Sequence, residues 1–213
     1  MSTVSRVDVA AQQVSLWTPI DGGVTAPEGF QAAGVACGLK PSGRSDLALL
    51  LAPDGAVCSG TFTTSVVRAA CVDLCCERLT SSAGRARAVL INSGQANACT
   101  GDRGRLDSLR ATQAVADQLG LDADAVLICS TGVIGVPIPM PTLFAGLAPL
   151  IAALSASGGS PAAEAILTTD LLAKQVALEI DLDGRRVRIG GMAKGSGMIH
   201  PDMATMLGFF SCD

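Results

Sequence analysis

The spacing of apolar residues along the chain predicts several short strands. Strand-like alternation covers residues 31–39, 47–52 and 57–63, and the turn-forming stretches KPSGRSD and PDG separate these segments. Two continuous apolar runs, RAVLIN at 87–92 and AVLIC at 125–129, are typical of strands that are buried on both faces. We therefore expect a sheet whose central strands are covered on both sides.

Helical spacing predicts helices between these strands. The clearest helix covers 106–119 and stops before Gly120, which suits a helix C-cap. Further patterns predict helices over 68–79 and from Ser160, and the apolar window LFAGLAPLIAALSA begins at Leu143. That window is too short to cross a bilayer, so we expect it to form a buried helix.

Regular alternation in VALEIDLDGRRVRIGG, around Asp183 and Gly184, predicts a β-hairpin. The chain shows no internal repeat, low-complexity tract or linker. We therefore predict one mixed α/β domain of the α+β kind, with mixed sheets sandwiched between helices.

Composition narrows the class of protein. The chain has 213 residues, 49% of them hydrophobic, so it can bury a sizeable core. A net charge of -4 without a basic run, and 3% aromatic residues, argue against nucleic acid and against an anionic membrane surface as partners. The first 17 residues lack the apolar run of a signal peptide, so we expect a cytoplasmic protein.

The eight cysteines do not form the pattern of a metal site. Most are scattered singly, the one cluster is Cys71, Cys75 and Cys76, and the chain has a single histidine. Structural zinc requires paired ligands that this spacing does not provide. We expect no bound metal and small buried thiols in a reducing compartment.

Three glycine-rich polar segments lie where predicted strands begin or end. They are NSGQANACTG at 92–101, STGVIG at 130–135 and GGMAKGSGM at 190–198. Strand ends hold such loops in place, and glycine lets backbone N–H groups approach a ligand. Each segment alone is compatible with an ordinary tight turn. Three of them, carrying Asn, Thr and Lys, favour a binding site.

Common nucleotide-binding and hydrolase motifs do not fit these segments. Lys194 precedes glycine and serine, which is the wrong order for a phosphate-binding loop, and no dinucleotide fingerprint follows a strand. The sequence CSTGVIG lacks the flanks of a nucleophile elbow. The single histidine, His200, lies beside Pro201, where a solvated or structural imidazole is the ordinary interpretation. A Ser-His-Asp hydrolase is therefore disfavoured.

The stretch KGSGMIHPDMATMLGFF, at 194–210, suggests a different nucleophile. A threonine hydroxyl can be activated without histidine by an α-amine, including its own amine once the preceding peptide bond is cut. Thr205 is therefore either a buried structural hydroxyl or a nucleophile released by cleavage after Ala204.

This stretch resembles the motif K-G-x-G-M-x-x-P-x-M-A-T-M-L of the ornithine acetyltransferases, bifunctional enzymes of arginine biosynthesis that cleave themselves between Ala and Thr. The segments GVTAPEGFQAAGVACGLKPSGRSDLALL, NSGQANACTG, STGVIG and LTTD also resemble signatures of that family, in its order, over residues 23–207. The resemblance implies an αββα fold similar to that of DmpA-like aminopeptidases. It also implies transfer of an acetyl group from N-acetylornithine to glutamate through a threonyl acetyl-enzyme.

The resemblance assigns expected roles position by position. Thr205 matches the nucleophile and also a substrate-binding position, and the bond between Ala204 and Thr205 matches the cleaved peptide. Thr131 and Gly132 match the oxyanion-hole pair, where a hydroxyl and a backbone N–H face the developing charge.

Two further matches are substrate-binding positions. They are Thr168, in TTD, and Lys194, whose ammonium suits the α-carboxylate of an amino acid. The family commonly has proline before the lysine that follows TTD, whereas this chain has Ala173 before Lys174. That departure affects the local loop and none of the assigned residues.

The resemblance implies no metal or prosthetic group. It implies N-acetylornithine and glutamate as substrates, and the sequence leaves open whether acetyl-CoA is a second donor. The implied protein partner is the β chain of the same precursor, in an α2β2 heterotetramer.

The family pattern divides the chain at the proposed cleavage point. Residues 1–204 match the α-chain region, and residues 205–213 match the start of the β chain. Because the family has a long β segment, we expect this chain to be truncated. Two alternatives to the transferase are an N-terminal-nucleophile aminopeptidase of the same fold and an inactive truncated subunit.

Overall fold

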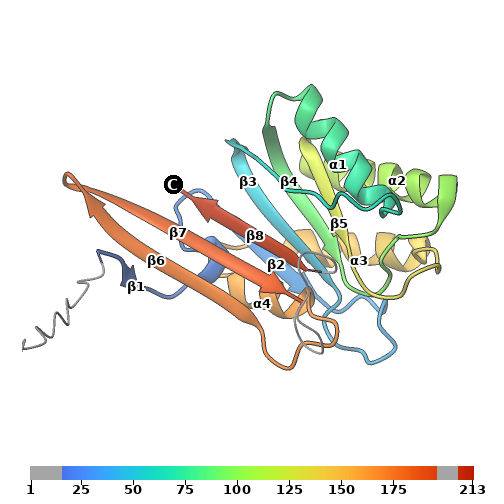
Figure 1. Cartoon of the computed structure of the whole chain (residues 1–213). Helices are drawn as coiled ribbons and strands as arrows, with labels where there is room; N and C mark the ends of the chain where they lie inside the picture. The colour runs from blue at the N-terminus through green and yellow to red at the C-terminus, as the bar shows by residue number, and fades with distance from the viewer. Residues whose placement is uncertain (1–15, 196–205) are drawn as a thin grey trace, which may run out of the picture.

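The computed structural model describes residues 16–195 and 206–213, which form two four-stranded sheets and four α-helices (Figure 1). The first sheet has the order β2 (Gln31–Val35), β3 (Leu47–Val57), β4 (Arg85–Asn92), β5 (Val126–Ser130). The second has the order β1 (Thr18–Pro19), β6 (Lys174–Leu182), β7 (Arg185–Lys194), β8 (Leu207–Cys212). The helices are α1 (Ala70–Ser81), α2 (Gly101–Leu119), α3 (Met140–Ala152) and α4 (Gly159–Ala165), with single 3-10 turns at η1 (Gly23–Thr25) and η2 (Ala123–Ala125).

The predicted fold class is confirmed, as are the β6–β7 hairpin and all four helices. The prediction of two separate strands at 47–52 and 57–63 is wrong. Residues 47–57 form a single strand, and the PDG sequence at 53–55 is accommodated by a register shift between Leu51 and Ala56 against β4. Residues 58–63 contain no strand. The predicted strand at 31–39 ends at Val35, and β8 was not predicted.

One face of the first sheet packs against three helices. Along β3, Leu47, Leu49 and Leu51 enter a core shared with α1, α2 and α3, where Leu143 and Val115 are also fully buried. Each such aliphatic side chain contributes about 1.5–3 kcal/mol through burial. Figure 1 shows these helices together on the side of the sheet away from β6 and β7.

The opposite face of the first sheet faces the second sheet. Ala48 and Leu50 of β3 pack with α4 and with Met192 of β7, so β3 is covered on both faces and reads as a continuous apolar run. α4 approaches β2 very closely at Gly34, where a side-chain carbon would lie 2.0 Å from Pro161 O. Glycine at this position therefore lets α4 fill the space between the sheets.

Side chains of α1 cover the free edge of β5. The Cys75 thiol donates to Ile128 O over 3.1 Å and accepts from Ile128 N–H over 3.4 Å. The Arg78 guanidinium donates to Val126 O and forms an ion pair with Asp124. These contacts satisfy backbone groups that an edge strand would otherwise expose.

The prediction of small buried thiols holds for some of the cysteines and not for others. All eight cysteines are free; Cys71 and Cys75 are buried, whereas Cys99 and Cys212 are exposed. Within residues 16–195 and 206–213, no three side chains gather in a way that could hold a metal ion. In the same part of the chain, no helix has the length and hydropathy needed to span a membrane.

Candidate functional site

The site begins where two parallel strands end side by side. β4 and β5 are parallel neighbours, and Asn92 pairs with Ser130 at their carboxyl ends. α2 forms the connection between them, so both strands run into glycine-rich loops at one edge of the sheet. This is the edge at which α/β proteins commonly assemble binding sites.

The two loops are joined by backbone hydrogen bonds. Thr131 N–H donates to Asn92 O over 3.0 Å, and Val133 N–H donates to Gly94 O over 3.1 Å. Ala96 N–H donates to Val133 O over 2.8 Å. The segments predicted from NSGQANACTG and STGVIG therefore form one folded unit.

Lys194, at the end of β7, brings the third glycine-rich segment to this unit. Its Nζ donates a hydrogen bond to Thr131 Oγ1 over 3.1 Å, and both residues are buried. Because Thr131 Oγ1 accepts this bond, its own hydrogen is left to donate to another group. Burial lowers the pKa of Lys194, while nearby Asp170 acts in the opposite direction.

Gly132 has a backbone that other residues adopt only with strain. Its φ is +127°, and a side-chain carbon there would lie 2.3 Å from Gly94 O. Among the described residues, no group accepts a hydrogen bond from the Gly132 N–H. Thr131 and Gly132 thus present a hydroxyl and an N–H at adjacent positions, which is the donor set that stabilises an oxyanion.

The loop containing Thr168 is tied to the end of β7 through Asp170. The buried Asp170 Oδ1 accepts from Lys174 Nζ and, over 2.9 Å, from Gly195 N–H. Burial alone would raise the pKa of Asp170, but the hydrogen bonds from Lys174 and Gly195 outweigh it and lower that pKa. Asp170 therefore remains ionised and fixes the backbone directly after Lys194.

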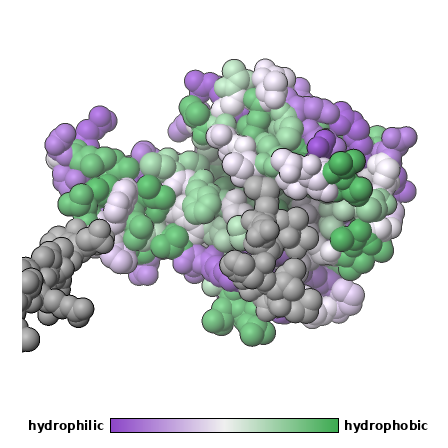
Figure 2. All heavy atoms as spheres, in the orientation of Figure 1, coloured by the Kyte–Doolittle hydropathy of each residue, from purple (hydrophilic) through white to green (hydrophobic). Residues whose placement is uncertain are grey.

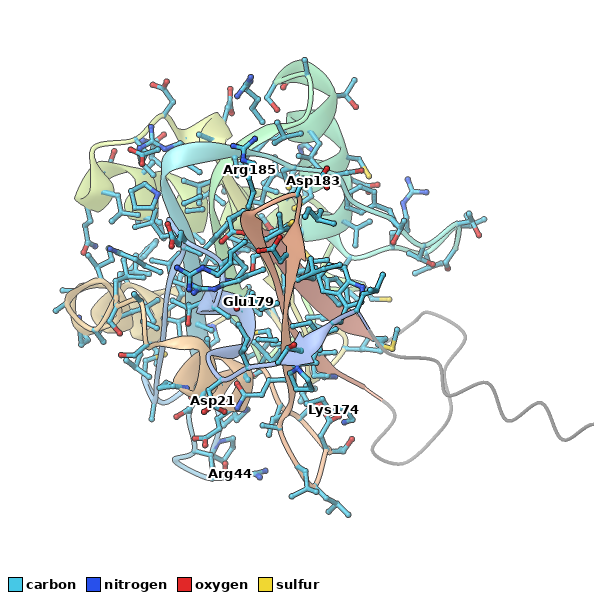
Figure 3. All side chains as sticks on the ribbon, turned by 90° about the vertical axis from the view of Figure 1, so that its left-hand side faces the viewer. Asp21, Arg44, Lys174, Glu179, Asp183 and Arg185 are labelled. Atoms are coloured by element: carbon cyan, nitrogen blue, oxygen red, sulfur yellow. The ribbon has the colours of Figure 1, made fainter. Side chains whose placement is uncertain are left out.

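An open groove of about 2030 Å³ lies between the two sheets, and the assigned residues that are described all line it. These residues are Thr131, Gly132, Thr168 and Lys194. Figure 2 shows apolar side chains gathered on the face that includes the β6–β7 hairpin. In Figure 3, Lys174 marks the site end of that hairpin, and Asp183 and Arg185 mark its turn at the opposite end.

The proposed nucleophile and cleavage bond, Ala204 and Thr205, lie outside the described residues. The chain is described again from Met206, whose Cα would be 3.0 Å from a side-chain carbon at Gly195. Leu207 then pairs with Lys194 as β8 runs antiparallel to β7. The residue that follows Thr205 in the chain therefore lies beside the site.

Several polar residues of this region were not predicted from the sequence. Asp46 is fully buried and accepts three backbone N–H bonds, and Lys40 and Ser93 connect the surrounding loops. An acid directly before the apolar run LALLLA was the available signal for Asp46. Asn92 and Asn97 organise their loops, because their side-chain amides donate hydrogen bonds to Gln95 O and to Gly104 O, respectively.

Comparison with other sequences gives extensive matches. The chain matches the model of the ArgJ family over residues 31–213. It is 76% identical over 207 residues to the arginine biosynthesis bifunctional protein ArgJ of Parasynechococcus marenigrum, covering 97% of this chain and 51% of that protein. It is 72% identical over 211 residues to the protein of that name from Prochlorococcus marinus, covering 99% and 49%. The chain spans about half the length of these curated relatives.

Solved structures agree with the sequence matches. The arginine biosynthesis bifunctional protein ArgJ from Bacillus halodurans has a TM-score of 0.81 and 34% identity, covering 90% of this chain and 98% of the other. Ornithine acetyltransferase from Mycobacterium tuberculosis, complexed with ornithine, has a TM-score of 0.79 and 44% identity, covering 90% and 100%. The family model, the relatives and the shared fold together establish that this chain belongs to the ArgJ family.

Proposed function

We propose that the protein to which this chain belongs transfers an acetyl group from N-acetylornithine to glutamate, with Thr205 as the nucleophile. The observation that carries the proposal is the contact between Lys194 and Thr131, beside the Gly132 N–H and the start of β8. Membership of the ArgJ family supports acetyl transfer as the chemistry. The 44% identical ornithine acetyltransferase complexed with ornithine supports an ornithine-like substrate.

The first half-reaction forms an acetyl ester on the enzyme. The α-amine of Thr205 accepts the proton from Oγ as Oγ attacks the acetyl carbonyl carbon of N-acetylornithine. The carbonyl oxygen becomes an oxyanion and accepts hydrogen bonds from the Thr131 hydroxyl and the Gly132 N–H. The C–N bond then breaks, the leaving amine takes the proton, and ornithine departs.

The second half-reaction returns the enzyme to its starting state. The α-amine of glutamate attacks the ester carbonyl, the same two donors stabilise the oxyanion, and Thr205 Oγ leaves with a proton. N-acetylglutamate is the product. Lys194 holds the Thr131 hydroxyl in place and, with Thr168, binds polar groups of the substrate, including its α-carboxylate.

The free α-amine arises by self-cleavage between Ala204 and Thr205. Thr205 Oγ attacks the carbonyl carbon of Ala204, the peptide bond breaks to give an ester and a free amine, and water hydrolyses the ester. Acetyl-CoA is a second acetyl donor for glutamate in this scheme. The proposed assembly is an α2β2 heterotetramer in the cytoplasm, and the scheme uses no metal or prosthetic group.

Ornithine release and N-acetylglutamate formation, measured on the purified full-length gene product, test the proposal. Wild type should form both products in equal amounts, and its intact mass should show a break before Thr205. Thr205→Ala should abolish cleavage and transfer, whereas Thr205→Ser should keep part of both. Normal turnover by the alanine variant would end the assignment of Thr205 as nucleophile.

A further inference from the structure

A buried carboxylate organises the loop between β2 and β3. Asp46 is 0% exposed, and its two oxygens accept backbone N–H bonds from Cys37 over 2.8 Å, Gly38 over 3.1 Å and Lys40 over 2.9 Å. Asp46 O also accepts from Ser93 N–H over 2.9 Å. The loop is therefore closed on itself and fixed to the loop that follows β4.

Two side chains carry this connection to the segment before Thr168. Ser93 Oγ donates to Ala165 O at the end of α4. Lys40 Nζ donates to Ser45 O over 2.7 Å within its own loop, and to Leu167 O over 2.6 Å. Leu167 directly precedes Thr168, so the Lys40 ammonium bonds to the backbone beside an assigned substrate-binding residue.

We propose that Lys40 is a positioning residue, which holds Thr168 at the groove through Leu167 O and thereby sets the affinity for the acetylated amino acid. The inference rests on the proposed function for its kinetic consequence. Lys40 and Thr168 line the same groove, and two of the three ammonium hydrogens are directed to backbone carbonyls. Charged donors make the stronger hydrogen bonds, so the contact depends on the charge of Lys40.

The surroundings of Lys40 make this contact sensitive to pH. Burial lowers the pKa of Lys40 to about 8; Asp46 acts in the opposite direction, and the positive charges of Arg44 and Lys194 lower it further. Lys40 is protonated at pH values well below about 8 and loses its proton as the pH rises through this value. The bond to Leu167 O therefore weakens in mildly alkaline solution.

Kinetics of the full-length protein test the role of Lys40. For Lys40→Met, we expect the KM for N-acetylornithine to rise about tenfold while kcat stays within about twofold. In wild type, KM should rise as the pH passes about 8. Lys40→Arg keeps a permanent charge, so it should restore most of the affinity and make the alkaline rise in KM smaller than in wild type.

Arg44→Met is the matched control, because it removes one positive charge from the same loop and leaves the contact with Leu167 O in place. Its KM near neutral pH should stay within about twofold of wild type, and the alkaline rise should persist at a slightly higher pH, because Arg44 no longer opposes the charge of Lys40. Melting temperatures of all variants separate misfolding from loss of affinity. An unchanged KM in a folded Lys40→Met protein, or an unchanged alkaline rise in both Lys40 variants, would overturn the inference.

Limited proteolysis provides a readout that does not need activity. Leu171 and Leu172, shortly after Thr168, are 90% and 78% exposed, so cleavage there reports how firmly the segment is held. Lys40→Met should be cut faster at this segment than Arg44→Met. Equal cutting would refute the contact itself. If Lys40→Met is cut faster than Arg44→Met but the wild-type protein shows no acetyl transfer, the contact stands and the proposed function is refuted.

Discussion

The Lys194 ammonium donates a hydrogen bond to the Thr131 hydroxyl over 3.1 Å, and through it the end of β7 meets the loop that follows β5. The two residues are 63 positions apart; Thr131 directly follows β5 of one sheet, and Lys194 is the last residue of β7 in the other. This contact fixes the direction in which the hydroxyl donates, because the oxygen is already an acceptor.

Replacing Thr131 should therefore affect chemistry more than folding. We expect Thr131→Ala to slow acetyl transfer about a hundredfold through loss of an oxyanion donor, with a melting temperature close to that of wild type. Steady-state kinetics and thermal unfolding on the same preparation measure both effects. Thr131→Ser keeps the hydroxyl and should keep most of the activity. Wild-type rates in Thr131→Ala would remove this residue from the site.

Gly132 should be intolerant of any side chain. A methyl group there meets Gly94 O at 2.3 Å and the backbone has φ +127°, so Gly132→Ala should cost about 3 kcal/mol of unfolding free energy. Gly135→Ala is the control in the same loop, with φ +79° and no heavy atom within 4 Å of the added carbon. It should cost about 1 kcal/mol. Urea unfolding compares the two, and equal losses would show that the approach to Gly94 is unimportant.

Asp170 should stabilise the fold in a pH-dependent way. Its folded pKa lies below its ordinary value of 3.8, so its contribution is present above that value and is lost as the pH falls through the folded pKa. Asp170→Asn should lower the melting temperature at pH 7, and the difference from wild type should shrink below about pH 4. Asp54→Asn, at an exposed carboxylate, should show little change. A constant difference for Asp170→Asn across pH would contradict this role.

The edge of β5 gives a prediction about stability alone. Arg78→Met leaves Val126 O without its donor, which should cost about 1–3 kcal/mol. The matched change, Arg105→Met, removes an exposed ion pair with Glu77 and should cost about 0.5 kcal/mol or less. Chemical denaturation of both variants measures the contrast. Similar losses of unfolding free energy would mean that the bond from Arg78 to Val126 O stabilises the fold no more than an exposed ion pair does.

Local sequence patterns predicted which helices and strands exist better than they predicted where each one begins and ends. The apolar runs of β4 and β5 identified both strands because burial on two faces leaves a continuous signal. The PDG sequence at 53–55 looked like a turn because a turn and a bulge use similar residues. Pairing of Ala56 with Ala86 decides between them, and that partner lies 30 positions away. β8 depends in the same way on pairing with β7.

The site was only partly accessible to sequence reasoning. The loops after β4 and β5 were expected at strand ends, and parallel pairing accounts for their meeting. The contacts of Lys194 with Thr131 and of Lys40 with Leu167 O join segments far apart in the chain, so no local spacing encodes them. Family resemblance supplied the roles of Thr131, Gly132, Thr168 and Lys194, and the structure supplies the groove that they share.

The antiparallel pairing of β7 with β8 has a consequence for a chain that is cut between them. Lys194 is opposite Leu207, and the pairing continues to Ile189 and Cys212. Ser211 Oγ also donates to Val24 O over 2.6 Å, which fastens β8 to the segment near the N-terminus. A break within 195–206 therefore leaves the strands on either side of it, β7 and β8, paired in one sheet. Cleavage would therefore create a new amino terminus while the two pieces stay associated through the pairing of β7 with β8.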